Sequence, residues 1–78
     1  MFQWRNLDRL ILDEAQLIAY IDYCKSHYRR KVFVLPAGHD LSNFKEKEFI
    51  TVSYERYGQR RSSYRNLFYA YVNFYKNN

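Results

Sequence analysis

Apolar and polar positions in the first third of the chain repeat with the period of an α-helix. The apolar side chains fall on one helical stripe: Leu17, Ile18, Ile21, Cys24 and Tyr28. Just before this stripe, Asp13 and Gln16 have the spacing of a capping box, in which each side chain accepts from the other residue's backbone N–H. The pattern predicts a helix over residues 14–29. Three upstream residues also fit a shorter helical segment: Leu7, Leu10 and Ile11.

The middle of the chain has the shorter period of β-strands. Residues 31–36 form a β-branched and aromatic run, and a turn begins at Pro36. Residues 48–57 alternate between an apolar and a polar face, as in a strand with one face in solvent, and Gly58 ends the pattern. Strands that follow one another in sequence usually lie side by side. We therefore predict that these two strands form an antiparallel hairpin.

The last apolar segment, residues 64–76, fits both regular structures. As a helix it has an apolar stripe that begins at Tyr64, with Ser62 or Ser63 as the cap. As a strand it has suitable alternation and residue types that favour strands. Its part from 68 to 76 aligns without gaps to residues 17–25 of the predicted helix, which favours the helix.

Together these elements predict a single α+β domain over residues 1–78. The expected order is α-β-β-α, with helices on one face of a small antiparallel sheet. The alternative is α-β-β-β, with residues 66–76 as a third strand. Because a sheet of two or three strands is only marginally stable alone, the sequence is also consistent with a homodimer.

Composition limits the classes of protein and cofactor. A single cysteine, Cys24, excludes an intrachain disulfide framework. The amino-terminal residues do not resemble a signal peptide, and no stretch approaches the roughly 20 apolar residues of a membrane span. Cys24, His27 and His39 are metal-ligand types, but their spacing is not that of a familiar zinc site. We therefore expect a protein of the reducing cytoplasm with no metal, no cofactor and no membrane partner.

The net charge of +5 is concentrated in two blocks. Residues 25–31 contain four cations and residues 56–78 contain five, and neither block contains an acid. An antiparallel hairpin would bring the two blocks to one end of the molecule. This predicted surface, the basic pole, comprises Lys25, Tyr28, Arg29, Arg30, Lys31, Arg56, Tyr57, Arg60, Arg61, Tyr64 and Arg65. It requires Arg30 and Arg60 to lie at the same end.

Interleaved cations and tyrosines suit nucleic acid, because arginine binds phosphate and tyrosine rings stack on unpaired bases. The leading hypothesis is a non-catalytic module that binds nucleic acid through the basic pole. No complete catalytic motif is present, so we expect no enzyme activity.

Tyrosine and arginine are also the usual anchors of protein interfaces. In size, charge and lack of a catalytic motif, the chain resembles the small accessory proteins of phages and mobile elements. The alternative is therefore a protein-binding inhibitor for counter-defence or host takeover. It would dock on an acidic or nucleic-acid-binding surface of a host protein.

Overall fold

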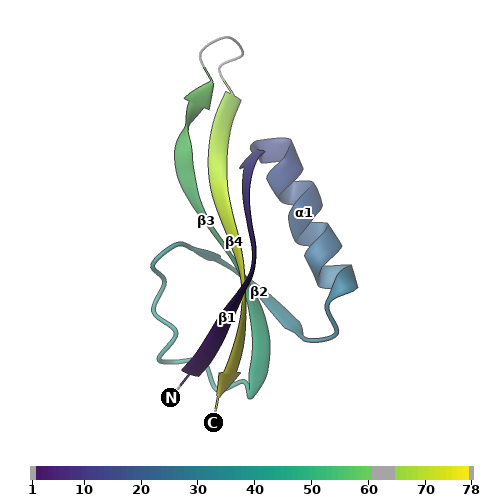
Figure 1. The fold of residues 1–78 in the computed structure, drawn as a ribbon, viewed down its shortest axis with the longest axis vertical. Coiled ribbons are helices and arrows are strands. Elements are labelled where there is room, and N and C mark those ends of the chain that lie inside the picture. Colours follow the sequence, from purple (N-terminus) through teal and green to yellow (C-terminus); the bar gives the residue numbers. More distant parts are fainter. Residues whose placement is uncertain (1, 61–64, 78) are drawn as a thin grey trace.

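A four-stranded sheet with one helix packed on it forms the structure (Figure 1). The computed structural model describes residues 2–60 and 65–77. In chain order the elements are β1 (Phe2–Asp13), α1 (Glu14–His27), β2 (Lys31–Pro36), β3 (Glu48–Arg60) and β4 (Arg65–Asn77). The molecule is elongated, with extents of 47 × 24 × 17 Å. The α+β class is thus confirmed, but the sheet has more strands than predicted.

The predicted helix is confirmed, two residues shorter at its carboxyl end. The capping box at its start is also confirmed. The Gln16 backbone N–H donates to Asp13 Oδ1 at 2.8 Å, and the Asp13 backbone N–H donates to Gln16 Oε1 at 3.0 Å. These two bonds satisfy backbone donors that a helix start would otherwise leave open. No helix in the described part of the chain combines the length and apolar character that crossing a bilayer requires.

The helical prediction for residues 64–76 is wrong, and the strand alternative is confirmed as β4. The helical segment predicted around Leu10 is also wrong, because that segment is β1. β1 and β4 pair antiparallel over almost their whole length, and β4 pairs antiparallel with β3 on its other edge. Pairing on two edges satisfies the β4 backbone and allows its tyrosine, phenylalanine and valine residues to pack on a pleated surface.

The predicted antiparallel hairpin of the two middle strands is wrong, because β2 and β3 are parallel. The register pairs Lys31 with Phe49 and Pro36 with Tyr54, so both strands run in the same direction. The connecting loop, residues 37–47, runs back along the sheet, which a parallel pair requires. The antiparallel partner of β3 along the chain is instead β4, the next strand in sequence.

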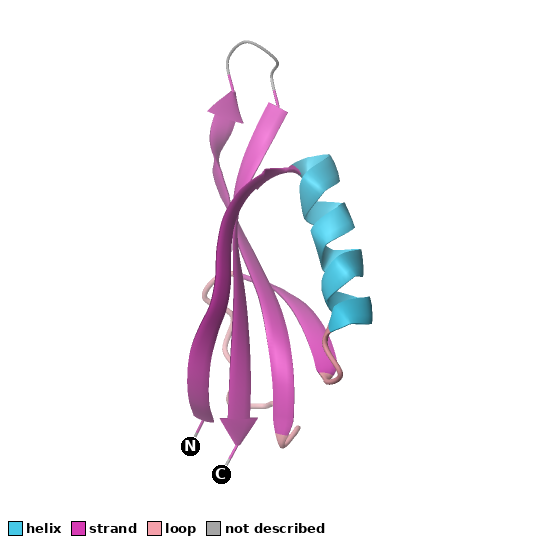
Figure 2. Ribbon diagram, turned by 45° about the vertical axis from the view of Figure 1, so that its right-hand side comes forward, coloured by secondary structure: helices cyan, strands magenta, loops and turns pink. Residues whose placement is uncertain are grey.

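The core lies between α1 and one face of the sheet, and Figure 2 shows the helix on that side. Its fully buried members are Cys24, Ile50, Val52 and Val72. The β2–β3 loop covers part of the opposite face, where Phe44 packs 5.3 Å from the buried Phe49 ring. The two faces of the sheet are therefore different. One carries the main core, and the other is covered only in part.

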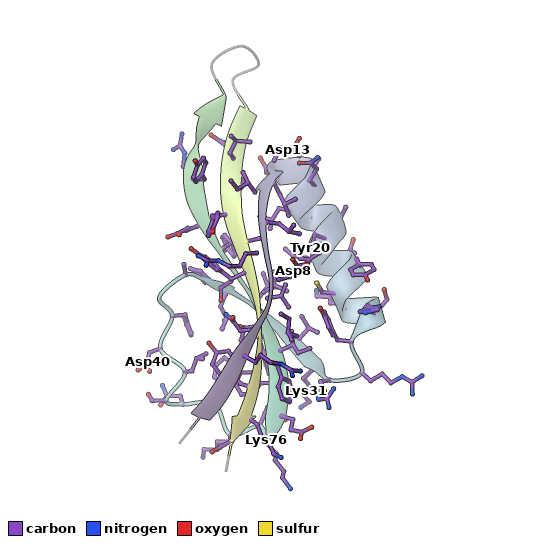
Figure 3. All side chains as sticks on the ribbon, in the orientation of Figure 1. Asp8, Asp13, Tyr20, Lys31, Asp40 and Lys76 are labelled. Carbon is purple, nitrogen blue, oxygen red and sulfur yellow. The ribbon has the colours of Figure 1, made fainter. Side chains whose placement is uncertain are left out.

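A hydrogen bond joins α1 to β1 at the edge of this core. The Tyr20 hydroxyl donates to Asp8 Oδ2 at 2.7 Å, and Figure 3 labels both residues. The register of β1 with β4 shifts between Asn6 and Asp8, so Asp8 is the first regularly paired residue after the shift. Bulges of this kind re-aim side chains. The pKa of Tyr20 is raised well above its ordinary value, first by burial and then by its bond to Asp8.

Replacing Tyr20 with phenylalanine should lower the free energy of unfolding by about 1–2 kcal/mol, because the Asp8 carboxylate would lose its donor. The matched control is Tyr23→Phe, since Tyr23 is 50% exposed on the same helix. Its effect should stay below about 0.5 kcal/mol. Urea unfolding of both variants measures the difference, and equal effects would argue against a stabilising Tyr20–Asp8 bond.

Stability should also fall in alkaline solution. Burial is the main cause that raises the pKa of Tyr20, Tyr28 and Tyr75 above 10.0 and the pKa of Cys24 above 9.0. Above these values the unfolded chain loses protons that the folded chain keeps. The contribution of these four groups to the free energy of unfolding is therefore fully present below about pH 9, and it is lost as the pH rises further. Unfolding curves across this range test the slope, which should be smaller in Tyr20→Phe. A flat profile would contradict the burial of these groups.

Candidate nucleic-acid interface

The basic pole does not exist as one surface. Because β2 is parallel to β3, Lys31 lies beside Phe49 at the start of β3, whereas Arg60 ends that strand. These two positions on β3 are eleven residues apart, or roughly 36 Å at the rise of a strand. Arg30 and Arg60 therefore lie at opposite ends, and the prediction that they share one end is wrong.

The first block forms what we call the foot cluster, which comprises Lys25, Tyr28, Arg29, Arg30 and Lys31. Two of its cations are paired with acids. Arg30 Nε lies 3.1 Å from Glu48 Oε2, and Lys31 Nζ lies 2.8 Å from Glu46 Oε1. Lys31 and Lys76 mark this end of the molecule in Figure 3. Glu46, just before β3, and Glu48, the first residue of β3, thus offset part of the charge of the foot cluster.

A small cavity of about 180 Å³ lies beside the foot cluster, between the helix end and the sheet. Arg5 and Arg30 both line it, and the Arg30 guanidinium carbon lies 4.8 Å from the centre of the Phe74 ring. Tyr28 lines another side, and burial raises its pKa. The cavity could accept a small anion only in competition with Glu48, which already binds Arg30.

Except for Lys76 at the foot, the described cations of the second block lie on the far part of the β3–β4 hairpin, which extends past the ends of β1 and α1 (Figure 1). We call this part the ribbon, residues 56–60 and 65–68. The register pairs Arg60 directly with Arg65, and Arg56 with Phe68. Arg61 and Tyr64 lie outside the described residues. Gly58 does not end the strand as predicted. Instead, the register shifts between Arg56 and Gly58, so that Tyr57 lies at a bulge.

A row of three aromatic rings lies beside the ribbon, on the sheet face opposite α1. We call these rings and the arginine beside them the tyrosine face; it comprises Arg9, Tyr57, Tyr69 and Tyr71. The Tyr57 and Tyr69 rings are stacked with centres 6.2 Å apart, and Tyr69 meets Tyr71 edge to face at 4.6 Å. The Arg9 guanidinium carbon lies 5.3 Å and 5.2 Å from the centres of the Tyr69 and Tyr71 rings. The three strands thus contribute to one continuous surface.

The alternation of the strands explains why these residues share a face. In β4, Ala70 and Val72 are buried on the helix side, so Tyr69 and Tyr71 point to the other side. Arg9 is paired with Tyr71 in the register of β1 with β4, which places it on the same face. Tyr57 is 61% exposed, although it stacks on Tyr69. The row therefore combines fixed rings with one ring that is open to solvent.

Tyr71 is held by a hydrogen bond to a neighbouring strand. Its hydroxyl donates to Glu55 Oε1 at 2.9 Å. Partial desolvation and then this bond raise the pKa of Tyr71 above its ordinary value. The phenol is therefore protonated at neutral pH, and the ring keeps a fixed orientation beside Arg9. The Glu55 carboxylate also lies on this face, and one of its oxygens accepts the hydrogen bond from Tyr71.

Arg9, Tyr69 and Tyr71 were absent from the predicted binding surface. Both segments that carry them had been interpreted as helices, and a helix would separate these side chains. The signal that could have found them is the alternation within β4, where tyrosine or asparagine occupies every second position between Tyr69 and Tyr75. Of the predicted site, Tyr57 belongs to the tyrosine face and Arg56, Arg60 and Arg65 to the ribbon beside it.

Comparisons with protein-family models, with curated proteins and with solved structures find no significant match to this chain. The functional argument therefore depends on the surface of this molecule alone. Within residues 2–60 and 65–77, no group of three or more histidine, cysteine or acidic residues is arranged to hold a metal ion.

The tyrosine face should contribute little to stability compared with the core. Tyr57→Ala should lower the free energy of unfolding by less than about 1 kcal/mol, because the ring is mostly exposed and loses only its stack on Tyr69. Val72→Ala should lower it by about 2 kcal/mol or more, because Val72 is fully buried. Thermal or urea unfolding compares the two variants. A larger effect for Tyr57 would mean that the row is structural.

Proposed function

We propose that this protein is a non-catalytic module that binds single-stranded nucleic acid on its tyrosine face. The observation that carries the proposal is the row of three tyrosine rings outside the main core, with the Arg9 guanidinium among them and the Tyr57 ring mostly exposed. Bases of any sequence can stack on such rings, and exposed aromatic residues on an open sheet face are a known platform for unpaired bases.

The position of the ribbon supports the same proposal. Residues 56–65 contain four arginines and no acid, and their described part continues directly from the tyrosine face. A strand whose bases stack on Tyr57 and Tyr69 would lie next to this segment along the hairpin, where Arg56 is paired with Phe68 on the α1 side of the sheet. Arginine binds phosphate oxygens through two N–H groups, which adds affinity that does not depend on sequence.

The register pairs the backbones of Arg60 and Arg65, so two arginine positions of the second block lie side by side at this end of the hairpin. The foot cluster is different, because Glu46 and Glu48 already neutralise two of its cations. We therefore assign the binding surface to the ribbon end of the molecule and not to the foot.

A protein-binding inhibitor is the second candidate, and Ile11 is the observation that favours it. Ile11 is paired with Tyr69 in the register and is 49% exposed on the same face. An exposed isoleucine among tyrosines and an arginine is typical of protein interfaces. This candidate would dock the same face on a host protein. It predicts a stoichiometric protein complex that nuclease treatment does not disrupt.

Fluorescence anisotropy with short labelled single-stranded DNA and RNA tests the proposal. Binding should weaken steeply as salt is raised, because phosphate contacts release counterions. The double variant Tyr57→Ala/Tyr69→Ala should lose roughly 5- to 150-fold in affinity, the range expected for lost base stacking. The matched control is Tyr23→Ala on the outer surface of α1, which should bind as the unchanged protein does.

A second pair of variants separates the two ends of the molecule. Arg9→Gln should weaken binding, and Arg30→Gln at the foot should not, although each removes one positive charge. Equal losses in both variants would indicate that only net charge matters. If neither DNA nor RNA binds at low salt, the proposed function is wrong, and the tyrosine face is then best tested as a protein interface.

A further inference from the structure

A second feature of the same sheet face is a cavity beneath the β2–β3 loop. Its volume is about 350 Å³, at the small end of the range of ligand sites in proteins. The loop supplies one side of it through Ala37, Gly38, His39 and Leu41. Gly38 has a φ of 81°, a left-handed conformation that glycine adopts without strain. Tyr71 lines the cavity and also belongs to the tyrosine face, so the two features are continuous.

The floor of the cavity is polar although it is buried. Thr51 and Asn73 are directly opposite each other in the register of β3 with β4, and both line the cavity. Thr51 is only 1% exposed. Among the described residues, Asn73 Oδ1 has no hydrogen-bond partner, and Thr51 Oγ1 has none of ordinary bonding geometry, although it lies close enough to the Tyr75 side chain to lower the pKa of Tyr75. Buried polar atoms are normally fully satisfied, so these two atoms on one cavity floor require an explanation.

The ends of this floor are aromatic. Tyr75 lines the cavity and stacks on the buried Phe49 ring, with centres 5.2 Å apart and planes 14° from parallel. Burial raises the pKa of Tyr75, and the nearby Thr51 hydroxyl counters part of that rise. At the other end, the cavity meets the Tyr71 ring, with Ser53 between. Flat apolar surfaces at both ends and hydrogen-bonding groups between them match a planar polar heterocycle.

We propose that this cavity is a subsite for one unstacked nucleobase of the strand bound on the tyrosine face. The base would lie between the Tyr71 and Tyr75 ends and give its N–H groups to Asn73 Oδ1 and Thr51 Oγ1. Asparagine is a frequent reader of base edges because its amide both accepts and donates hydrogen bonds. The inference rests on the proposed function for the strand, but it adds a preference among bases that stacking alone does not supply.

The polar floor also has a consequence for stability. A buried hydroxyl without a partner destabilises the fold relative to a methyl group of the same shape. Thr51→Val should therefore raise the melting temperature, by roughly 4 °C or more for a domain of this size. The same change should weaken the preference among bases. A gain in stability with a loss of binding is the expected signature of a residue kept for its ligand and not for the fold.

The test compares labelled homopolymers of each base by anisotropy. The unchanged protein should prefer one of them by roughly 5- to 150-fold, the discrimination expected from hydrogen bonds to a base edge. In Thr51→Val and Asn73→Val, the affinities for the homopolymers should differ by no more than about 2-fold. All of them should be close to the affinity of the unchanged protein for the homopolymer that it binds least tightly. Asn43→Ala is the matched control, because Asn43 is exposed on the same loop and does not line the cavity.

Mononucleotides separate this inference from the proposed function. Without a strand to stack, a mononucleotide should shift the backbone amide NMR signals of Thr51, Ser53 and Asn73, and should not do so in Asn73→Val. If homopolymers bind but the cavity variants discriminate as the unchanged protein does, the subsite is wrong and the proposed function stands. If mononucleotides shift these signals but no homopolymer binds, the cavity binds bases and the proposed function is wrong. If neither binds, both are wrong.

Discussion

The fold depends on the pairing of β4 along both of its edges. β4 is paired with β1 on one side and with β3 on the other, over almost its full length. Because side chains alternate along a strand, this one segment supplies both the core and the opposite surface. Ala70 and Val72 are buried under α1, whereas Tyr69, Tyr71 and Asn73 project to the other side. A shift of one residue in either register would exchange these two sets and disrupt both faces at once.

This constraint explains which parts of the fold could be predicted. Helix α1, its capping box and the location of β2 and β3 follow from local patterns, and local patterns identified them correctly. The identity of β4 was ambiguous, because Tyr64 to Tyr75 have a helical apolar stripe as well as strand alternation. What resolves the ambiguity is pairing with β1 and β3, a non-local interaction that no pattern within residues 64–76 contains.

The site was less predictable than the fold for the same reason. Its residues come from three strands, and only the register brings Arg9 beside Tyr69 and Tyr71. The sequence displays charge blocks, but it does not say where they meet. Once β2 is parallel to β3, the foot cluster lies beside Glu46 and Glu48, and the ribbon lies at the far end. The surface therefore keeps from the prediction only the ribbon arginines and Tyr57.

The charge distribution has a physical consequence that the net charge of +5 conceals. Pairs between exposed side chains such as Arg30 and Glu48 contribute little stability, but they do lower the local potential at the foot. The ribbon end has no acid between residues 56 and 65, so its potential is reduced less. Under the proposed function, an anionic strand would be attracted mainly to the ribbon end, next to the mostly exposed Tyr57 ring. Under the proposed function, long-range attraction and short-range stacking would favour neighbouring parts of the molecule, whereas the predicted basic pole had joined both charge blocks at one end.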